Sequence, residues 1–330
     1  MAVDGTASAI LEVQGLTVEY ITDGPPARAV DNVTFSVRPG EFLGLVGESG
    51  CGKSTMLFSI AGLLQPPAEV REGAVLFKGQ DLRRLSEREL RAIRWRGFSV
   101  VMQSAMNALN PVKSVGAQFR DAMRAHGTTD AEQITLRSQE VMKLVGIDPV
   151  HLRSYPHQLS GGMRQRAMIA MALLFSPDLI LMDEPTSALD VVAQRSLMYQ
   201  IKELQERLGF AMIFVTHDMS LVTRFSDRLA VMYAGKIVEI GPTPQIFNHP
   251  SHPYTQGLFD AFPSMYGERR PLVGIPGAPP DLSDLPSGCK FHPRCPQARP
   301  ECSQEDPVAY PVDDAEVRCV LYKPVKAAHG

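Results

Sequence analysis

The residues with the clearest capacity for chemistry form one stretch, Gly47–Thr55, which reads GESGCGKST. Its spacing is G-x-x-x-x-G-K-[ST], in which glycines let the backbone turn tightly and present successive N–H groups to an anion. Lys53 can reach the β- and γ-phosphates of a nucleotide, and the Ser54 hydroxyl can bind Mg²⁺. We therefore predict that the whole loop contacts ATP: Gly47, Glu48, Ser49, Gly50, Cys51, Gly52, Lys53, Ser54 and Thr55.

A second candidate element follows later in the chain, where the apolar run Leu179–Met182 ends in two carboxylates. Asp183 can hold Mg²⁺, directly or through water, and Glu184 can polarise the water that attacks the γ-phosphate. Taken alone, such a strand end is equally consistent with a solvated acidic turn. Its position downstream of a phosphate loop favours the catalytic interpretation.

The pattern of apolar residues predicts the elements that would position these groups. Strands are expected over residues 11–20, 29–37, 42–46, 73–78, 98–103, 179–182, 211–215, 228–233 and 236–240. From residue 112 to about 155 the pattern becomes helical and amphipathic, with breaks at Gly127 and at residues 146–149. Strands that alternate with helices predict an α/β fold with a largely parallel sheet covered on both faces, and the helical stretch is interpreted as an insertion.

Composition narrows the class of protein. The 330 residues suggest about two domains, and 44% apolar with 21% charged residues is ordinary for a globular protein. A net charge of −3 without a Lys/Arg block argues against nucleic acid as a partner. The most apolar stretch, Ala167–Phe175, is too short to span a bilayer, and the N-terminus lacks the features of a signal peptide. We therefore expect a cytosolic chain that reaches a membrane only through a partner.

A third motif, LSGGM at residues 159–163, lies between the two elements and is followed by RQR. With it the chain resembles the ATP-binding cassette family, whose signature is LSGGQ-like. Ser160, Gly161 and Gly162 would open a helix and offer bare amides and a hydroxyl. The resemblance implies that they bind the γ-phosphate of ATP held by an opposite subunit. Met163 replaces the signature glutamine, and this leaves the serine and glycine contacts intact.

The resemblance covers about residues 9–245 and implies roles for further residues. Tyr20 is similar to the aromatic residue that stacks on adenine, and Gln103 to the glutamine that contacts Mg²⁺ and water and senses the membrane partner. Residues 187–190 (SALD) match the D-loop, so that Asp190 joins the nucleotide site, and His217 matches the switch histidine near the γ-phosphate. The simpler interpretations are a packed aromatic for Tyr20, an exposed strand end for Gln103 and a helix cap for His217.

This family resemblance implies a P-loop NTPase cassette over residues 1–245, with a RecA-like parallel sheet core, an antiparallel β subdomain and a helical insertion at about 104–178. Its part up to about residue 157 would pass motion to membrane subunits. Glu184, His217 and Gln103 would be catalytic, and Ser54, Gln103 and Asp183 would hold Mg²⁺. ATP and Mg²⁺ are therefore the expected cofactors.

The tail after Gly241-Pro242 has frequent prolines and few long periodic elements, so it is not expected to form a large core. It must therefore be stabilised by a cross-link or a bound metal, or by packing on the rest of the chain. Four of the five cysteines occur there, with the spacing C-x5-C-x6-C-x16-C. The spacing supports a thiolate metal site without identifying the metal, because it lacks paired C-x2-C knuckles and matches no common ferredoxin pattern. The candidate ligands are Cys289, Cys295, Cys302 and Cys319, with His292 as a rival.

Three stretches of the tail narrow the resemblance: HPYTQGL at 252–258, IPGAPPDL at 275–282 and GCKFHPRCP at 288–296. They resemble the ATP-binding subunits of oligopeptide and dipeptide importers, a group that includes nickel and some oligosaccharide systems. RQR after the signature resembles the first of the two cassette subunits of such importers. The resemblance implies a C-terminal domain over residues 246–330 that can carry a [4Fe–4S] cluster, with Zn²⁺ or unmetallated thiols as alternatives.

The resulting hypothesis is an ATPase that powers peptide import across the bacterial cytoplasmic membrane, bound peripherally at its cytoplasmic face. Its partners would be a second related ATPase subunit, two transmembrane permease subunits and an extracellular solute-binding protein. Import of nickel or oligosaccharide is the alternative within this architecture. A soluble ABC ATPase acting on DNA or ribosomes would be expected to carry a second cassette, a coiled coil or a basic arm. A redox-sensing protein, in which the cysteine site matters more than hydrolysis, is the third possibility.

Overall fold

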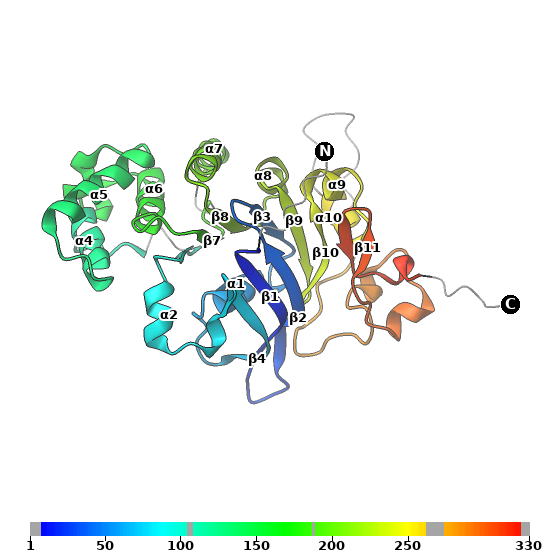
Figure 1. Ribbon diagram of the computed structural model, residues 1–330. Helices are drawn as coiled ribbons and strands as arrows, with labels where there is room; N and C mark the ends of the chain where they lie inside the picture. The colour runs from blue at the N-terminus through cyan, green and yellow to red at the C-terminus, as the bar shows by residue number, and fades with distance from the viewer. Residues whose placement is uncertain (1–7, 104–107, 187–188, 262–273, 325–330) are drawn as a thin grey trace. The chain divides into compact units, whose positions relative to one another are not determined.

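The computed structural model describes residues 8–103, 108–186, 189–261 and 274–324, shown in colour in Figure 1. The chain forms two compact units. Unit 1 comprises Met1–Leu11, Ser36–Phe42 and Leu76–Phe214, and unit 2 comprises Glu12–Phe35, Leu43–Val75 and Val215–Gly330. The first residues of the predicted insertion (104–107) and Ser187-Ala188 of the predicted D-loop lie outside the described residues.

Unit 1 contains a run of neighbouring strands in the order β8-β7-β6. Their bounds are β6 Phe98–Val101, β7 Leu179–Asp183 and β8 Ala211–Val215. β6 and β7 are parallel, with Phe98 opposite Leu179. Every residue of β7 and β8 is buried, which is typical of strands covered on both faces. A two-residue strand, β5 (Gln80–Asp81), pairs with the end of β4 (Ala68–Phe77).

Three helices of unit 1 end shortly before a glycine at positive φ, namely Gly127, Gly146 or Gly209. The helices of this unit are α2 Glu87–Ile93, α4 Val115–Ala125, α5 Ala131–Leu144, α6 Gly161–Ala172 and α7 Val191–Leu208, with the 3₁₀ turns η1 Leu82–Arg84, η2 Pro149–Arg153 and η3 Pro156–Gln158. In α4 the buried residues Val115, Phe119 and Met123 recur every four positions, which places them on one face. The predicted helical stretch is confirmed, with its breaks at Gly127 and Gly146, both at positive φ. Figure 1 shows α4, α5 and α6 grouped together in green.

Unit 2 holds the other strands: β1 Leu11–Tyr20, β2 Ala27–Val37, most of β4, β3 Phe42–Val46, β9 Arg228–Tyr233, β10 Lys236–Pro242, β11 Tyr310–Val312 and β12 Ala315–Val317. β2, β1 and β4 are neighbours in this order, and a second run has the order β11-β12-β10-β9-β3. β3 and β9 are parallel, whereas β10 pairs antiparallel with β9 and with β12. The helices are α1 Lys53–Ile60, α8 Met219–Phe225, α9 Thr243–Asn248 and α10 Pro253–Asp260, with the turns η4 His292–Arg294, η5 Pro300–Ser303 and η6 Val320–Tyr322.

The proline-rich tail lies on its neighbour. β12 adds to the edge of β10, with Val317 opposite Glu239, and β11 pairs with β12. Three rings form the tail's main apolar contact: Tyr254 lies 4.6 Å from Tyr233 and 5.3 Å from Phe291, measured between ring centroids. The tail therefore shares a core with unit 2.

Several boundaries differ from the sequence-based expectations. β4 begins at Ala68, five residues before the expected start, and β6 ends at Val101, so that Gln103 follows the strand. Strands β5, β11 and β12 and helix α2 were not expected. The short strands have two or three residues each, too few for a periodic signal, and exist because a partner strand supplies their hydrogen bonds.

Candidate nucleotide site and cysteine cavity

The phosphate loop connects the end of β3 at Val46 with the start of α1 at Lys53. Its glycines are required by geometry at two positions. Gly47 and Gly52 have φ of +153° and +106°, and an added Cβ would lie 2.1 Å from Met232 O and 1.9 Å from Ala29 O, respectively. Only glycine fits such close backbone approaches. The first turn of α1 has no side-chain cap, and the N–H groups of a helix N-terminus favour an anion.

Lys53 lies across the loop rather than in solvent, with 6% of its surface exposed. Its Nζ donates to Gly47 O and Glu48 O, each at 2.8 Å, and lies 3.6 Å from Cys51 Sγ. A buried ammonium bonded to carbonyl oxygens at the loop entrance can exchange these partners for phosphate oxygens. Burial raises the pKa of the Cys51 thiol, so this cysteine is an un-ionised loop residue at neutral pH.

Tyr20 and His217 are two other predicted residues of unit 2. The hydroxyls of Tyr20 and Thr55 are 3.0 Å apart, which places Tyr20 beside the first turn of α1. His217 precedes α8, but the helix is capped by Asp218, whose Oδ1 accepts from the Ser220 N–H at 2.9 Å. The helix-cap interpretation of His217 is therefore wrong.

Unit 1 brings together two of the predicted catalytic residues. Asp183 is the last residue of β7, with 2% of its surface exposed. Glu184 follows at φ +43°, a left-handed conformation that is rare for glutamate and that turns the chain sharply after the strand. Gln103 Nε2 donates to Glu184 Oε2 at 2.8 Å. An amide beside a carboxylate can orient a water molecule while the carboxylate accepts its proton.

Two further predicted residues begin helices in unit 1. Ser160 caps α6, and its Oγ accepts from the Met163 N–H at 3.3 Å, while Gly162 faces open space where an added Cβ would meet nothing within 4 Å. The predicted helix start at the signature is confirmed. Asp190 caps α7, with Oδ1 accepting from the Ala193 N–H at 2.9 Å.

The four cysteines of the tail converge on one small cavity in unit 2, together with His252 and His292. Burial raises the pKa of Cys289 to about 11 and also raises the pKa of Cys295 and Cys319. These thiols are consequently protonated at neutral pH in the absence of a compensating cation. All four cysteines are free rather than disulfide-bonded. Within the described ranges, however, no group of three or more His, Cys, Asp or Glu has the arrangement of a metal-ion site, so the metal stays a prediction.

His252 places a buried imidazole ring at this cavity. His252 caps α10, and its Nδ1 accepts from the Tyr254 N–H at 3.0 Å, so in the neutral ring the proton is on Nε2. Among the described residues, Nε2 has no hydrogen bond of normal geometry. Burial lowers the pKa of His252, and an interaction of the ring with the Arg318 backbone partly offsets this lowering. The rival ligand His292 lies with its Nδ1 2.9 Å from Cys289 O. A buried imidazole N–H in the same cavity as four sulfur atoms fits a thiolate-rich centre.

Known proteins resemble the chain over nearly its whole length. Residues 30–187 match the ABC transporter family, and residues 238–302 match the oligopeptide/dipeptide transporter C-terminal region. The dipeptide transport ATP-binding protein DppD of Bacillus subtilis (strain 168) is 45% identical over 301 residues, covering 90% of both chains. The chain belongs to the ABC transporter ATPases. DppD of Escherichia coli (strain K12) is 41% identical and covers 93% of this chain and 98% of its own.

Further comparisons agree with this membership. The oligopeptide transport ATP-binding protein OppD of Haemophilus influenzae is 42% identical, covering 89% of this chain and 91% of its own. Among solved structures, the ATP-binding cassette MJ0796 bound to ADP and Pi aligns with a TM-score of 0.63 at 30% identity, covering 71% of this chain and 98% of that one. The chain is thus an ATPase with the α/β P-loop cassette fold, and ATP with Mg²⁺ is its expected nucleotide. No helix within the described ranges of this ABC ATPase is long and apolar enough to cross a membrane.

Sequence reasoning missed two residues that contact the loop of this ABC ATPase. Tyr254 OH accepts from the Glu48 N–H at 2.9 Å, and Arg294 forms an ion pair with the Glu48 carboxylate at 2.7 Å. They are 206 and 246 positions away from Glu48 in the chain. No local motif could have indicated either contact. The only available signal was that Tyr254 and Arg294 belong to the HPYTQGL and GCKFHPRCP stretches.

Proposed function

We propose that this ABC ATPase powers the import of dipeptides or oligopeptides across the bacterial cytoplasmic membrane. The observation that carries the ATPase part is the phosphate loop, in which Gly47 and Gly52 admit no side chain and the Lys53 ammonium is bonded to loop carbonyls. The peptide class is supported by the C-terminal region and by relatives described as dipeptide and oligopeptide transport ATP-binding proteins.

The roles follow from the chemistry of each side chain. The loop amides and Lys53 hold the β- and γ-phosphates, and Tyr20 stacks on adenine. Ser54, Asp183 and Gln103 bind Mg²⁺ or its water ligands. Glu184 directs water in line at the γ-phosphate, with His217 near the same phosphate. The hydrogen bond between Gln103 and Glu184 supports a shared water-positioning role.

The ATPase is proposed to act as one of two related cassettes. Ser160, Gly161, Gly162 and Asp190 would meet ATP held by the partner cassette, because a helix N-terminus with bare amides favours a phosphate. ATP binding would close the pair and hydrolysis would open it. Two membrane-spanning subunits and an external binding protein complete the transporter, with this subunit bound at the cytoplasmic face.

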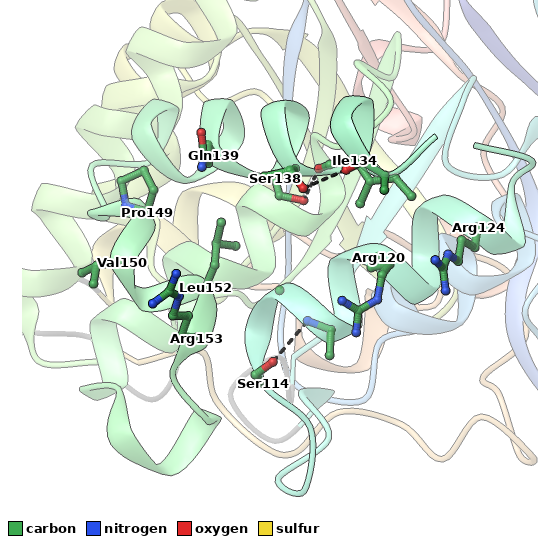
Figure 2. Close-up of a pocket in the computed structure, with 14 residues that line it drawn as sticks. Ser114, Arg120, Arg124, Ile134, Ser138, Gln139, Pro149, Val150, Leu152 and Arg153 are labelled. Atoms are coloured by element: carbon green, nitrogen blue, oxygen red, sulfur yellow. Dashed lines mark hydrogen bonds between the residues drawn. The ribbon is translucent and has the colours of Figure 1, made fainter. Parts of the chain in front are cut away.

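Contact with a membrane subunit is proposed for a cavity of about 910 Å³ between α4, α5 and η2. Figure 2 shows Arg120 and Arg124 along α4 and Arg153 on η2 at its edges. None of the three guanidinium groups forms an ion pair with a carboxylate of the described residues. A cavity rimmed by three unpaired cations is complementary to a partner loop that carries Asp or Glu.

The cysteine cavity is proposed to hold a metal centre through Cys289, Cys295, Cys302 and Cys319, a [4Fe–4S] cluster with Zn²⁺ as the alternative. The convergence of the four sulfur atoms and the buried His252 ring on one cavity supports this. When bound, the metal would supply the positive charge that lets buried thiols ionise, and its ligation would contribute folding free energy to the tail. A structural role is favoured because the tail has no core of its own.

The test uses the whole transporter purified in membrane discs with its external binding protein. Dipeptides and oligopeptides are each expected to stimulate ATP hydrolysis, whereas Ni²⁺ and oligosaccharides are not. Stimulation by Ni²⁺ or by an oligosaccharide alone would overturn the peptide assignment and leave the ATPase assignment intact.

A further inference from the structure

Glu48 places a carboxylate inside the phosphate loop, where a negative charge opposes the binding of a triphosphate. We propose that Arg294 and Tyr254 are positioning residues for this loop, by which the C-terminal segment (residues 246–330) neutralises Glu48 and holds it away from the phosphates. The inference rests on the assignment of Gly47–Thr55 to the phosphates of ATP.

Arg294 and Glu48 form a bidentate ion pair. Arg294 Nη1 lies 2.7 Å from Glu48 Oε2, and Nη2 lies 3.0 Å from Oε1, so the two planar groups are joined by two parallel hydrogen bonds. The Arg294 side chain is 7% exposed and that of Glu48 is 24% exposed. A shielded, bidentate pair is much stronger than a solvated surface pair and has a fixed orientation.

Arg294 is itself held on all sides. Nε donates to Pro276 O at 2.8 Å, Nη2 also reaches Gly277 O at 3.3 Å, and Nη1 reaches Tyr233 OH at 3.3 Å. With the two bonds to Glu48, these contacts use all five N–H donors of the guanidinium. The Glu48 carboxylate raises the pKa of Arg294. The cation is therefore permanent and cannot swing away from the loop.

The Glu48 backbone is held by a second residue of the C-terminal segment. Its N–H donates to Tyr254 OH at 2.9 Å, and its carbonyl accepts from Lys53 Nζ at 2.8 Å. Tyr254 is fully buried, with its ring against Tyr233 and Phe291. Glu48 is thus bound at its side chain, its N–H and its carbonyl, and two of these three contacts come from the C-terminal segment.

The functional consequence is electrostatic. Without Arg294, the Glu48 charge would remain next to the amides that bind phosphate, and it would repel ATP through a partly buried environment of low dielectric. A lysine cannot replace the Arg294 guanidinium group, because an ammonium offers no planar pair of N–H donors to the Glu48 carboxylate. A contact that merely attached the tail would leave nucleotide affinity independent of the charge on Glu48.

The experiment measures the affinity of the full-length purified chain for Mg-ATP, with kcat and KM for hydrolysis in the assembled transporter. Arg294→Gln is expected to raise Kd for Mg-ATP roughly tenfold or more. Its KM for hydrolysis should rise by a larger factor than its kcat falls. The defect should shrink as salt screens the repulsion. Adding Glu48→Gln to Arg294→Gln should restore most of the lost affinity. A double variant as weak as Arg294→Gln would overturn the proposal.

Asp306→Asn is the matched control, because Asp306 also joins the tail to the body, through Lys236 Nζ at 2.8 Å, without touching the loop. The Mg-ATP affinity of Asp306→Asn should equal that of the unmodified chain. If Asp306→Asn and Arg294→Gln lose the same affinity, Arg294 only attaches the tail and has no separate role at the loop. If Arg294→Gln does not fold, Arg294→Lys and Tyr254→Phe carry the test. Both are expected to weaken affinity several-fold, and unchanged affinity in both overturns the proposal.

Lys53→Ala separates this inference from the function on which it depends. It should lose ATP binding. Retained binding in Lys53→Ala would remove the phosphate-loop assignment itself. Loss in Lys53→Ala with unchanged affinity in Arg294→Gln would remove only the role of Arg294.

Discussion

The two units of the chain carry different halves of the proposed ATP chemistry. Unit 2 contains the phosphate loop, Tyr20 and the tail that holds the loop, which are proposed to act on binding, together with the proposed catalytic residue His217. Unit 1 contains Glu184, Gln103, the signature helix α6 and the arginine-rimmed cavity, which are proposed to act on turnover and on partner binding. Because these groups lie in different units, we expect that substitutions can impair ATP binding and ATP hydrolysis separately.

The sharpest separation is expected at Glu184. Glu184→Gln removes the general base but keeps the side-chain size and the hydrogen-bonding capacity toward Gln103, so kcat should fall by roughly two to four orders of magnitude. Mg-ATP binding should persist and accumulate an ATP-bound closed pair, measured by light scattering. Retained hydrolysis would take Glu184 out of its role.

The reciprocal effect is expected in the phosphate loop. Gly52→Ala forces a Cβ against Ala29 O at a strained φ, so ATP affinity should fall roughly 10- to 100-fold. Gly50→Ala is the matched control, because its added Cβ meets nothing within 4 Å although its φ is +79°. Equilibrium binding of a fluorescent ATP analogue measures both. Equal losses would show that conformational strain, rather than close approach to Ala29, governs the loop.

A smaller effect, on stability rather than chemistry, is expected at the cysteine cavity. Cys295→Ser removes one proposed ligand, so bound metal should be lost and the unfolding midpoint should fall by roughly 5 °C or more. Metal analysis, an absorption spectrum and a thermal melt measure this. Cys51→Ser, which changes the only cysteine outside the tail, should keep the metal. Identical metal content in both variants would contradict the four-cysteine site.

The smallest effect is expected at the partner surface of unit 1. Arg120→Glu with Arg124→Glu reverses the charge at the cavity edge, which should weaken assembly with the membrane subunits about tenfold. ATP hydrolysis by the isolated chain should not change, because neither arginine contacts a proposed catalytic residue. Assembly unaffected by this change would exclude the cavity as the docking surface.

Much of the nucleotide site could be predicted because its signals are local. Nine consecutive residues specify the loop, and each glycine that the backbone geometry requires is visible in the motif. The strand before the loop was predicted with its observed bounds, and the breaks in the helical insertion fall at the expected glycines. Here the physical requirement and the residue that meets it lie at the same position.

The tail was predictable only in part. Its prolines correctly indicated that it could not form a core alone, but strands β11 and β12 have three residues each and are stabilised by β10 rather than by their own pattern. The cysteine spacing indicated four candidate ligands but not their arrangement in space. That arrangement depends on the path of the chain after Cys302, which brings Cys319 to the same cavity as the other three cysteines.

By itself, the sequence determined the phosphate loop, the α/β alternation, the signature and the family, because each depends on residue types at fixed short spacings. Only the tertiary structure decided which distant residues contact the phosphate loop. The contacts of Glu48 with Tyr254 and Arg294 span more than two hundred positions. No short-range pattern encodes such a pairing, since it exists only once the tail has packed on unit 2 and aligned two planar charged groups.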